Sequence, residues 1–250
     1  MMVYPSGMIA INKPAMMISK DVSRNLKRAF GKLKMGHVGT LDPLATGVLP
    51  ILLGKATKFQ DPLLDLPKRY RFKIRFGLLT DTLDICGQNL EQQDNVSVDL
   101  ARMSDIGKTF LGEITQIPPL YSAVKHKGKP LYYYARKGVH VPLEEKARKV
   151  QVFDLRILGG GSDWAEVEVT CSRGTYVRVL AKDMAAQLGY HGTVIELERT
   201  QAAGISIENA APWETIEKLL QNEQDISQYI IPIEKFPDGP RMTRHAGWRN

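Results

Sequence analysis

Residues 68–76, "KRYRFKIRF", alternate strictly between cationic and apolar side chains. Tyr70, Phe72, Ile74 and Phe76 fall on one face of an extended chain and the cations on the other. This period of two predicts a half-buried β-strand. Because such a strand must pair along its edges, the segment commits this part of the chain to a β-sheet with one packed face.

Helical and extended patterns interleave irregularly along the rest of the chain. Further strands are predicted at 7–12, 48–54, 149–158, 164–171 and 193–200, and helices at 19–33, 55–64, 97–111, 130–137, 174–189 and 211–222. Ser19 is the predicted N-cap of the first helix. Pro50 places its strand at an edge or a bulge. The pattern predicts a mixed α/β or α+β domain, with one large sheet, over residues 1–205.

The remaining residues, 206–250, are too few for a stable independent domain. They contain one helical pattern and are then interrupted by proline and glycine. We expect this short C-terminal extension to dock on the main domain or to be partly disordered.

The chain is basic, with a net charge of +7 and a pI of about 9.3, which favours a polyanionic partner. Cations concentrate in 68–75 and 125–149, whereas acids concentrate in 81–105 and 213–238. This asymmetry indicates one basic binding face on an acidic remainder. The alternative is charge scattered over a solvated surface.

The two cysteines, Cys86 and Cys171, form no CxxC pair. Their spacing argues against a disulfide framework and a structural zinc site, and it favours a reducing compartment. The N-terminus lacks the basic and apolar regions of a signal peptide, and no apolar run approaches the ~20 residues of a membrane span. We therefore expect a cytoplasmic protein without a membrane segment.

A glycine-rich stretch at 36–50, "GHVGTLDPLATGVLP", carries a single carboxylate, Asp42. It is the only acidic residue between Asp21 and Asp61, and cations lie on both sides. Pro43 disfavours a helical backbone at Asp42 and holds it in an extended or turn geometry. Either Asp42 forms a local turn or it performs chemistry on a bound polyanion. The histidines are dispersed, and no phosphate-loop or metal-ligand spacing is present.

The stretch "GHVGTLDPLATGVLPILLGKATKF" closely resembles the signature motif of the tRNA pseudouridine synthase B family. Other segments resemble the family's motifs in the same order: "AINKP", "KRYRFKIRFGLLTDTLDICG", "QIPPLYSAVKHKGKPLYYYARKG", "SRGTYVRVLAKDMAAQLG" and "TVIELERT". The resemblance covers residues 7–205. It implies a pseudouridine-synthase-like α+β catalytic domain around one large, mixed, largely antiparallel sheet flanked by helices.

The family converts uridine 55 in the T-loop of tRNA to pseudouridine without a metal or cofactor. Carried over by resemblance, Asp42 is the catalytic residue and Arg178 the arginine that pairs with it and orients it. Asp42 would act as a nucleophile on the ribose or as a base at its 2′ carbon, and the sequence does not choose between them. A solvated charge on a helix surface is the alternative for Arg178.

The resemblance also assigns residues that hold the flipped uridine. Tyr70 would pack on the uracil, His37 would displace or hold flipped nucleotides, and Tyr176 and Leu197 would line the pocket. Without the resemblance, Tyr70 and Leu197 would both be predicted as core residues. Lys13 and the adjacent Pro14 would support the floor of the site, Pro14 structurally.

The expected partner is the T-arm of tRNA, bound by a monomer through the cationic face of helix 19–33 and a basic insertion near 117–150. Two features depart from the family pattern. "KPAMMISKD" keeps only Ser19 where the family has a glycine followed by a Thr-Ser pair, which puts the local turn in doubt. Residues 206–250 are too short for the RNA-binding domain that commonly ends bacterial members, so that domain would be incomplete or absent.

Two alternatives to the leading function stay open at this stage. The same motifs would serve a pseudouridine synthase for another RNA. A non-catalytic tRNA-binding or folding module would bind RNA without forming product.

Overall fold

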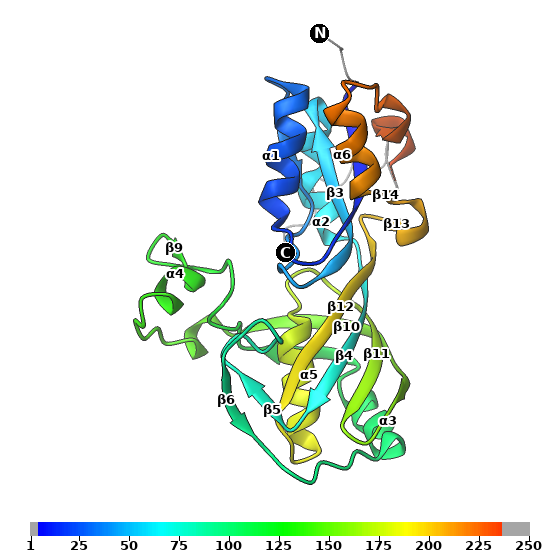
Figure 1. Ribbon diagram of the computed structural model, residues 1–250. Helices are drawn as coiled ribbons and strands as arrows, with labels where there is room; N and C mark the ends of the chain where they lie inside the picture. Colours follow the sequence, from blue (N-terminus) through cyan, green and yellow to red (C-terminus); the bar gives the residue numbers. More distant parts are fainter. Residues whose placement is uncertain (1–4, 237–250) are drawn as a thin grey trace. The chain divides into compact units, whose positions relative to one another are not determined.

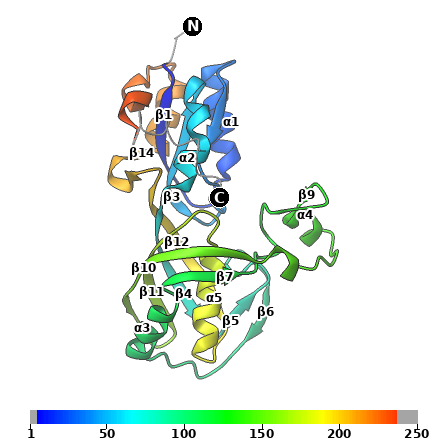
Figure 2. The same ribbon diagram turned by 180° about the vertical axis from the view of Figure 1, so that it is seen from behind.

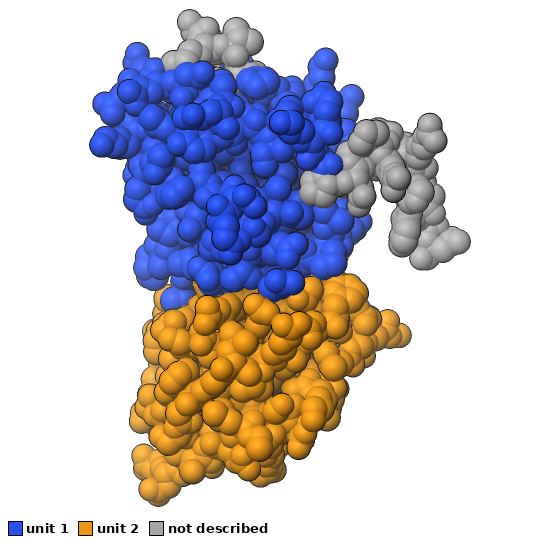
Figure 3. Space-filling model, turned by 90° about the vertical axis from the view of Figure 1, so that its right-hand side faces the viewer, with its two compact units in different colours: residues 1–69, 198–250 blue, residues 70–197 orange. Residues whose placement is uncertain are grey.

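A computed structural model describes residues 5–236 of the chain (Figure 1). The chain divides into two compact units, which are coloured separately in Figure 3. Unit 1 comprises residues 1–69 and 198–250, and unit 2 comprises residues 70–197. Within residues 5–236, no helix is long and apolar enough to cross a membrane.

Unit 1 is built on an antiparallel pair of buried strands, β1 (Gly7–Lys13) and β3 (Thr46–Leu53). Its remaining elements are β2 (Met35–His37), β13 (Ile205–Ser206), β14 (Ala211–Pro212), β15 (Ile230–Pro232), α1 (Ser19–Phe30), α2 (Gln60–Asp65), α6 (Trp213–Gln221) and the 3-10 helices η1 (Gly54–Phe59), η3 (Ile207–Asn209), η4 (Ser227–Tyr229) and η5 (Ile233–Lys235). A core cluster that includes Met8, Leu52 and Leu63 is completely buried.

Pro50 lies in the middle of β3 rather than at a sheet edge, because β1 and β2 flank this strand on opposite sides. Its carbonyl accepts a hydrogen bond from the Val38 amide at 2.9 Å, just past the end of β2. The N–H that proline lacks would point the same way as that carbonyl. This side lies just beyond the end of β2, so the missing N–H does not interrupt the pairing of β3 with β1. The predicted strand is confirmed, whereas its predicted place at an edge or a bulge was wrong.

Helix α1 buries Val22, Leu26 and Phe30 on one face, as the sequence predicts. It ends at Phe30, three residues earlier than predicted, and Gly31 adopts a φ of +65° that favours glycine. Ser19 is not the N-cap, because Ile18 occupies that position without a side-chain cap. The Ser19 hydroxyl is buried and serves another segment, described below.

Unit 2 contains most of β4 (Lys68–Phe76) and β12 (Gly192–Ala202), which continue into it from unit 1. The other strands are β5 (Leu78–Thr80), β6 (Asn89–Gln92), β7 (Gly112–Gln116), β8 (Lys125–His126), β9 (Lys129–Pro130), β10 (Arg148–Gly160) and β11 (Trp164–Cys171), and the helices are α3 (Leu100–Thr109), α4 (Leu131–Ala135), α5 (Val177–Gln187) and the 3-10 helix η2 (Glu144–Lys146). Helix α3 packs against β10 and also contacts α5 (Figure 2).

Within residues 5–236, hydrogen bonds join eleven strands in one mixed sheet, in the main order β14-β1-β3-β12-β4-β11-β10-β7. The β10–β11, β10–β7 and β1–β3 pairs are antiparallel, whereas β12 runs parallel to β3. The predicted mixed α+β class is therefore confirmed, as are the hairpin between β10 and β11 and the alternation along β4.

The cations of β4 belong to the sheet more than to a binding surface. Ion pairs join Arg71 to Glu166 at 2.8 Å, Lys73 to Glu196 at 2.9 Å and Arg75 to Asp163 at 2.8 Å. Each pair links β4 to a neighbouring strand or turn of unit 2. Charge count alone therefore overstates how much of segment 68–75 is available to a polyanion.

Residues 205–236 dock on unit 1, in agreement with one of the two expectations for the extension. β14 pairs parallel with β1, and β15 pairs antiparallel with the same strand. The two compact units divide after residues 69 and 197, and the predicted domain boundary at residue 205 stays a prediction. The basic ending "RMTRHAGWRN" lies outside the described residues.

Candidate active site

Asp42 lies half-buried in the loop that connects β2 to β3 in unit 1. The Ala45 amide donates to the Asp42 carbonyl at 3.1 Å, which closes a turn at the aspartate. Gly39 and Gly47 have φ values of +78° and +99° on either side of it. These are backbone conformations that side chains other than glycine rarely adopt, so the glycines are needed to shape this loop.

The residues on both sides of Asp42 are held by the segment that follows β1. The Ser19 hydroxyl accepts from the Leu41 amide and donates to the Leu41 carbonyl, both at 3.0 Å. The Pro43 carbonyl accepts from the Met16 amide at 2.7 Å and from Lys13 Nζ at 3.3 Å. The carboxylate between Leu41 and Pro43 is therefore carried on a backbone fixed at both neighbours.

Lys13 is completely buried, and its ammonium also donates to the carbonyls of Pro14 and Met17 at 2.8 Å each. Burial lowers the pKa of Lys13 from 10.5 to about 8, while the negative charge of Asp42 opposes this change and the positive charge of Arg199 adds to it. The lysine thus combines a structural role in the floor of the loop with an electrostatic influence on the catalytic candidate.

The unfolding free energy should reveal this buried lysine through its pH dependence. Between pH 8 and 10.5 the unfolded chain keeps the Lys13 proton that the folded chain has lost, so this contribution to stability rises with pH. The stability of the wild type relative to Lys13→Met should therefore increase by up to about 3 kcal/mol over that window. Urea titrations at several pH values measure it. A difference between the two proteins that stays constant over this pH range would contradict the expectation.

His37 ends β2 on the approach to the same loop, and its Nε2 lies 3.0 Å from the Thr40 hydroxyl. Burial lowers the pKa of His37 below its ordinary value, with further lowering by the charges of Arg199 and Lys20. The imidazole is consequently neutral at pH 7, and it is able both to donate and to accept a hydrogen bond.

Met16 occupies the position where the family pattern has a glycine, and its φ is +61°. The turn that the substitution put in doubt is therefore retained, at the expense of backbone strain. Replacing Met16 with Gly should raise the unfolding free energy by about 0.5–1 kcal/mol, because glycine adopts this conformation without strain. The same change at Met17, whose φ is not positive, should lower it. Urea denaturation measures the unfolding free energy of both variants, and an equal decrease in the two would contradict the presence of strain at Met16.

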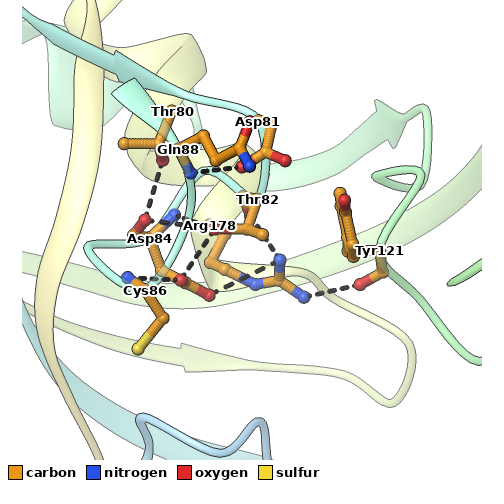
Figure 4. A network of polar contacts seen from close by, with 8 residues as sticks. All are labelled: Thr80, Asp81, Thr82, Asp84, Cys86, Gln88, Tyr121 and Arg178. Carbon is orange, nitrogen blue, oxygen red and sulfur yellow. Dashed lines mark hydrogen bonds and ion pairs between the residues drawn. The ribbon is translucent and has the colours of Figure 1, made fainter. Parts of the chain in front are cut away.

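The second group of predicted residues lies in unit 2, around the buried Arg178 of α5 (Figure 4). Its guanidinium donates to the Thr82 carbonyl through Nη1 and to the Tyr121 carbonyl through Nη2, the latter at 3.0 Å. Nη1 also lies 3.7 Å from Asp84 Oδ2. Arg178 is therefore not a solvated helix-surface charge.

Asp84 is itself buried and organised by its own loop. Its Oδ1 accepts from the Thr82 hydroxyl at 2.8 Å and from the Cys86 amide at 3.0 Å. The loop is fixed on β12, where the Ile85 amide donates to the Val194 carbonyl. Sequence reasoning did not identify Asp84 as a partner of Arg178, although Asp84 lies within a segment that resembles a family motif.

Tyr176 lies immediately before α5 and is anchored by the buried side chain of Gln116. The Tyr176 amide donates to Gln116 Oε1 at 2.9 Å, and Gln116 Nε2 donates back to the Tyr176 carbonyl at 3.2 Å. The Arg148 guanidinium lies 4.5 Å from the centre of the tyrosine ring, a cation–π contact. The aromatic ring is thus held in one place.

Tyr70 is half-buried on the apolar face of β4, and Leu197 is buried on β12. The seven predicted site residues accordingly form two groups. Lys13, His37 and Asp42 are in unit 1, and Tyr70, Tyr176, Arg178 and Leu197 are in unit 2. The predicted pairing of Asp42 with Arg178 would join the two groups and stays a prediction.

Solved structures share this fold. A Cbf5-Nop10-Gar1 complex contains a chain that aligns with a TM-score of 0.67 and 26% identity over 92% of this chain and 60% of its own. A chain of an H/ACA RNP bound to a substrate RNA aligns with a TM-score of 0.65 and 22% identity, over 89% of this chain and 57% of its own. This chain therefore spans less than two thirds of the aligned chain in either structure.

Sequence comparison identifies the family, whereas the structural similarity identifies the fold. The chain belongs to the TruB family of pseudouridylate synthases, whose N-terminal domain matches residues 27–177. It is 43% identical to tRNA pseudouridine synthase B of Clostridium tetani, over 92% of this chain and 77% of that protein. It is 42% identical to the protein of the same name from Pasteurella multocida, over 91% and 74%.

Proposed function

We propose that this protein is a tRNA pseudouridine synthase that isomerises uridine 55 in the T-loop, with Asp42 as its catalytic carboxylate. Family membership and the relatives' name support the reaction. The observation that carries the assignment of Asp42 is its clamped position: one carboxylate in a glycine-shaped loop, fixed at Leu41 by Ser19 and at Pro43 by Lys13.

The reaction exchanges one bond for another within a single nucleotide. The bond between ribose C1′ and uracil N1 breaks, the base rotates, and C1′ bonds to C5, while C5 loses a proton and N1 gains one. No atom is added, so no co-reactant is required. Asp42 attacks the ribose as a nucleophile or removes a proton at its 2′ carbon as a base, and both roles need the ionised carboxylate.

A uridine in a folded loop must be flipped out before either step, at an expense of a few kcal/mol. Stacking of a base on an aromatic ring returns about 1–3 kcal/mol. In this proposal Tyr70 packs on the uracil, Tyr176 and Leu197 line its pocket, and neutral His37 holds a displaced nucleotide. Arg178 orients Asp42, and Lys13 supports the loop.

The basic insertion, residues 117–150, is proposed to grip the T-arm. Both ribbon views show β9 and α4 on an arm that stands away from the body of unit 2 (Figures 1 and 2). Lys137 and Lys129 lie 4.8 and 4.4 Å from the centre of the Tyr133 ring. Their hydrogen bonds to the Tyr133 hydroxyl lower its pKa. Three lysines at its hairpin, Lys125, Lys127 and Lys129, are exposed.

Replacing Lys125, Lys127 and Lys129 together with Gln should weaken tRNA binding and flatten its salt dependence. For each phosphate that the variant no longer neutralises, the slope of log K against log salt should become shallower by up to about 0.9. Filter-binding titrations from 50 to 300 mM salt measure the slope. Gln at the ion-paired Arg71, Lys73 and Arg75 provides the control, and an unchanged slope for the hairpin variant would exclude this arm as the phosphate grip.

The reaction is tested on unmodified tRNA transcripts, with pseudouridine mapped by carbodiimide labelling and primer extension. A single stop at position 55, absent from a transcript with cytidine there, is the expected result. Binding without any stop would favour a non-catalytic tRNA-binding module. Stops that occur only in other RNAs would indicate a pseudouridine synthase with a different RNA substrate. We also propose that the protein is a monomer and that it acts in the cytoplasm.

A further inference from the structure

Arg199, on β12, connects the two ends of the Asp42 loop through a single buried guanidinium. It is only 1% exposed, and its Nε donates to the Val48 carbonyl at 2.7 Å. Its Nη2 donates to the Gly39 carbonyl at 2.9 Å. Gly39 precedes Asp42 and Val48 follows it, so one planar group fixes the backbone on both sides of the carboxylate.

Gly39 and Gly47, at the two ends of the loop, lie so close to Arg199 that a larger residue at either position would crowd it. A Cβ atom on Gly39 would lie 3.1 Å from Arg199 Nη1, and one on Gly47 would lie 2.3 Å from the Arg199 carbonyl oxygen. Arg199 and Gly47 are also register partners where β12 runs parallel to β3. Backbone and side chain of Arg199 therefore both determine where the loop begins and ends.

The positive charge of Arg199 is buried without an ion-pair partner among the described carboxylates. A buried arginine normally pairs with a carboxylate, but in residues 5–236 no carboxylate forms an ion pair with Arg199. Burial is the largest cause of the lowered pKa of His37 and of Lys13, and the positive charge of Arg199 lowers both pKa values further. The charged groups that influence His37 are Arg199 on β12 and Lys20 on α1.

We propose that Arg199 is a positioning residue for the reaction: its guanidinium ties Gly39 to Val48 so that Asp42 is presented in one geometry, and it places a buried positive charge beside this loop. The proposal rests on the function proposed above for Asp42. It requires Arg specifically, because a lysine would supply the charge without the planar pair of donors that reaches two carbonyls.

Arg199→Met and Arg199→Lys separate the two parts of the proposal. Single-turnover pseudouridine formation should fall at least 100-fold in the Met variant and at least tenfold in the Lys variant, with the Kd for tRNA changed less than threefold. In NMR titrations of the free protein, the pKa of His37 should rise toward 6.5 in Arg199→Met and stay low in Arg199→Lys. Arg156→Met, at an exposed arginine of β10, should match the wild type in both measurements.

Amide hydrogen exchange distinguishes positioning from general stability. The Leu41 and Ala45 amides should exchange at least tenfold faster in both Arg199 variants, whereas the paired amides of β1 and β3 should exchange at the wild-type rate. Equal acceleration throughout unit 1, or wild-type turnover by Arg199→Met, would overturn the proposal. If the wild type forms no pseudouridine, the proposed function fails, but amide exchange still decides whether Arg199 orders this loop, and the His37 titration still decides whether its charge acts there.

Discussion

Asp42→Asn is expected to abolish pseudouridine formation while leaving tRNA binding intact. Asparagine has nearly the same shape as aspartate, so the contacts of Ser19 with Leu41 and of Lys13 with Pro43 should survive the change. It can act neither as the anionic nucleophile nor as the base. The single-turnover rate should therefore fall by at least about 10⁴-fold, or about 5.5 kcal/mol of transition-state stabilisation.

Binding supplies the internal check on that result. Removing a negative charge beside a polyanion does not weaken its electrostatic attraction, so the Kd for tRNA should stay within about threefold or become tighter. Asp61→Asn, at an exposed acid of α2 in the same unit, should leave both rate and affinity unchanged. An Asp42→Asn protein that still forms pseudouridine at a tenth of the wild-type rate would remove Asp42 from the chemistry.

The sequence was most informative where a pattern is local. The alternation along β4, the apolar stripe of α1 and the buried run of β3 depend on side chains within a few residues of each other, and all three predictions agree with the structure. The glycines and proline around Asp42 likewise indicated a shaped turn before any family was considered, because their backbone preferences are intrinsic.

Long-range contacts explain what the sequence did not show. Serine is a residue type typical of N-caps, but the Ser19 hydroxyl forms hydrogen bonds with the backbone of Leu41, which lies beyond the end of α1. An arginine in a strand is usually expected to point into solvent. Arg199 is instead buried against the Asp42 loop, because β12 pairs with β3. Only the packed fold reveals such partners, since nothing local to either residue points to the other.

The Asp84–Arg178 pair is expected to show the largest stability effect of any ion pair in unit 2. Both side chains are buried, at 8% and 3% exposure. Arg178→Met would leave the Asp84 carboxylate buried without its cation, so the unfolding free energy should fall by about 3–5 kcal/mol. Arg75→Met, at a half-exposed arginine paired with Asp163, should lower it by no more than about 1 kcal/mol. Urea denaturation of each variant measures the difference.

A double-mutant cycle then separates the pair from its surroundings. Asp84→Asn keeps an acceptor for the Thr82 hydroxyl and the Cys86 amide, but it removes the charge that faces Arg178. If the two side chains act as one unit, the double variant should lose less than the sum of the single losses, by about 1–3 kcal/mol. Additive losses would mean that Asp84 does not help to hold Arg178, which the Thr82 and Tyr121 carbonyls also contact. In that case Asp84 would stabilise its own loop, and the guanidinium would keep its full charge for a partner outside the pair.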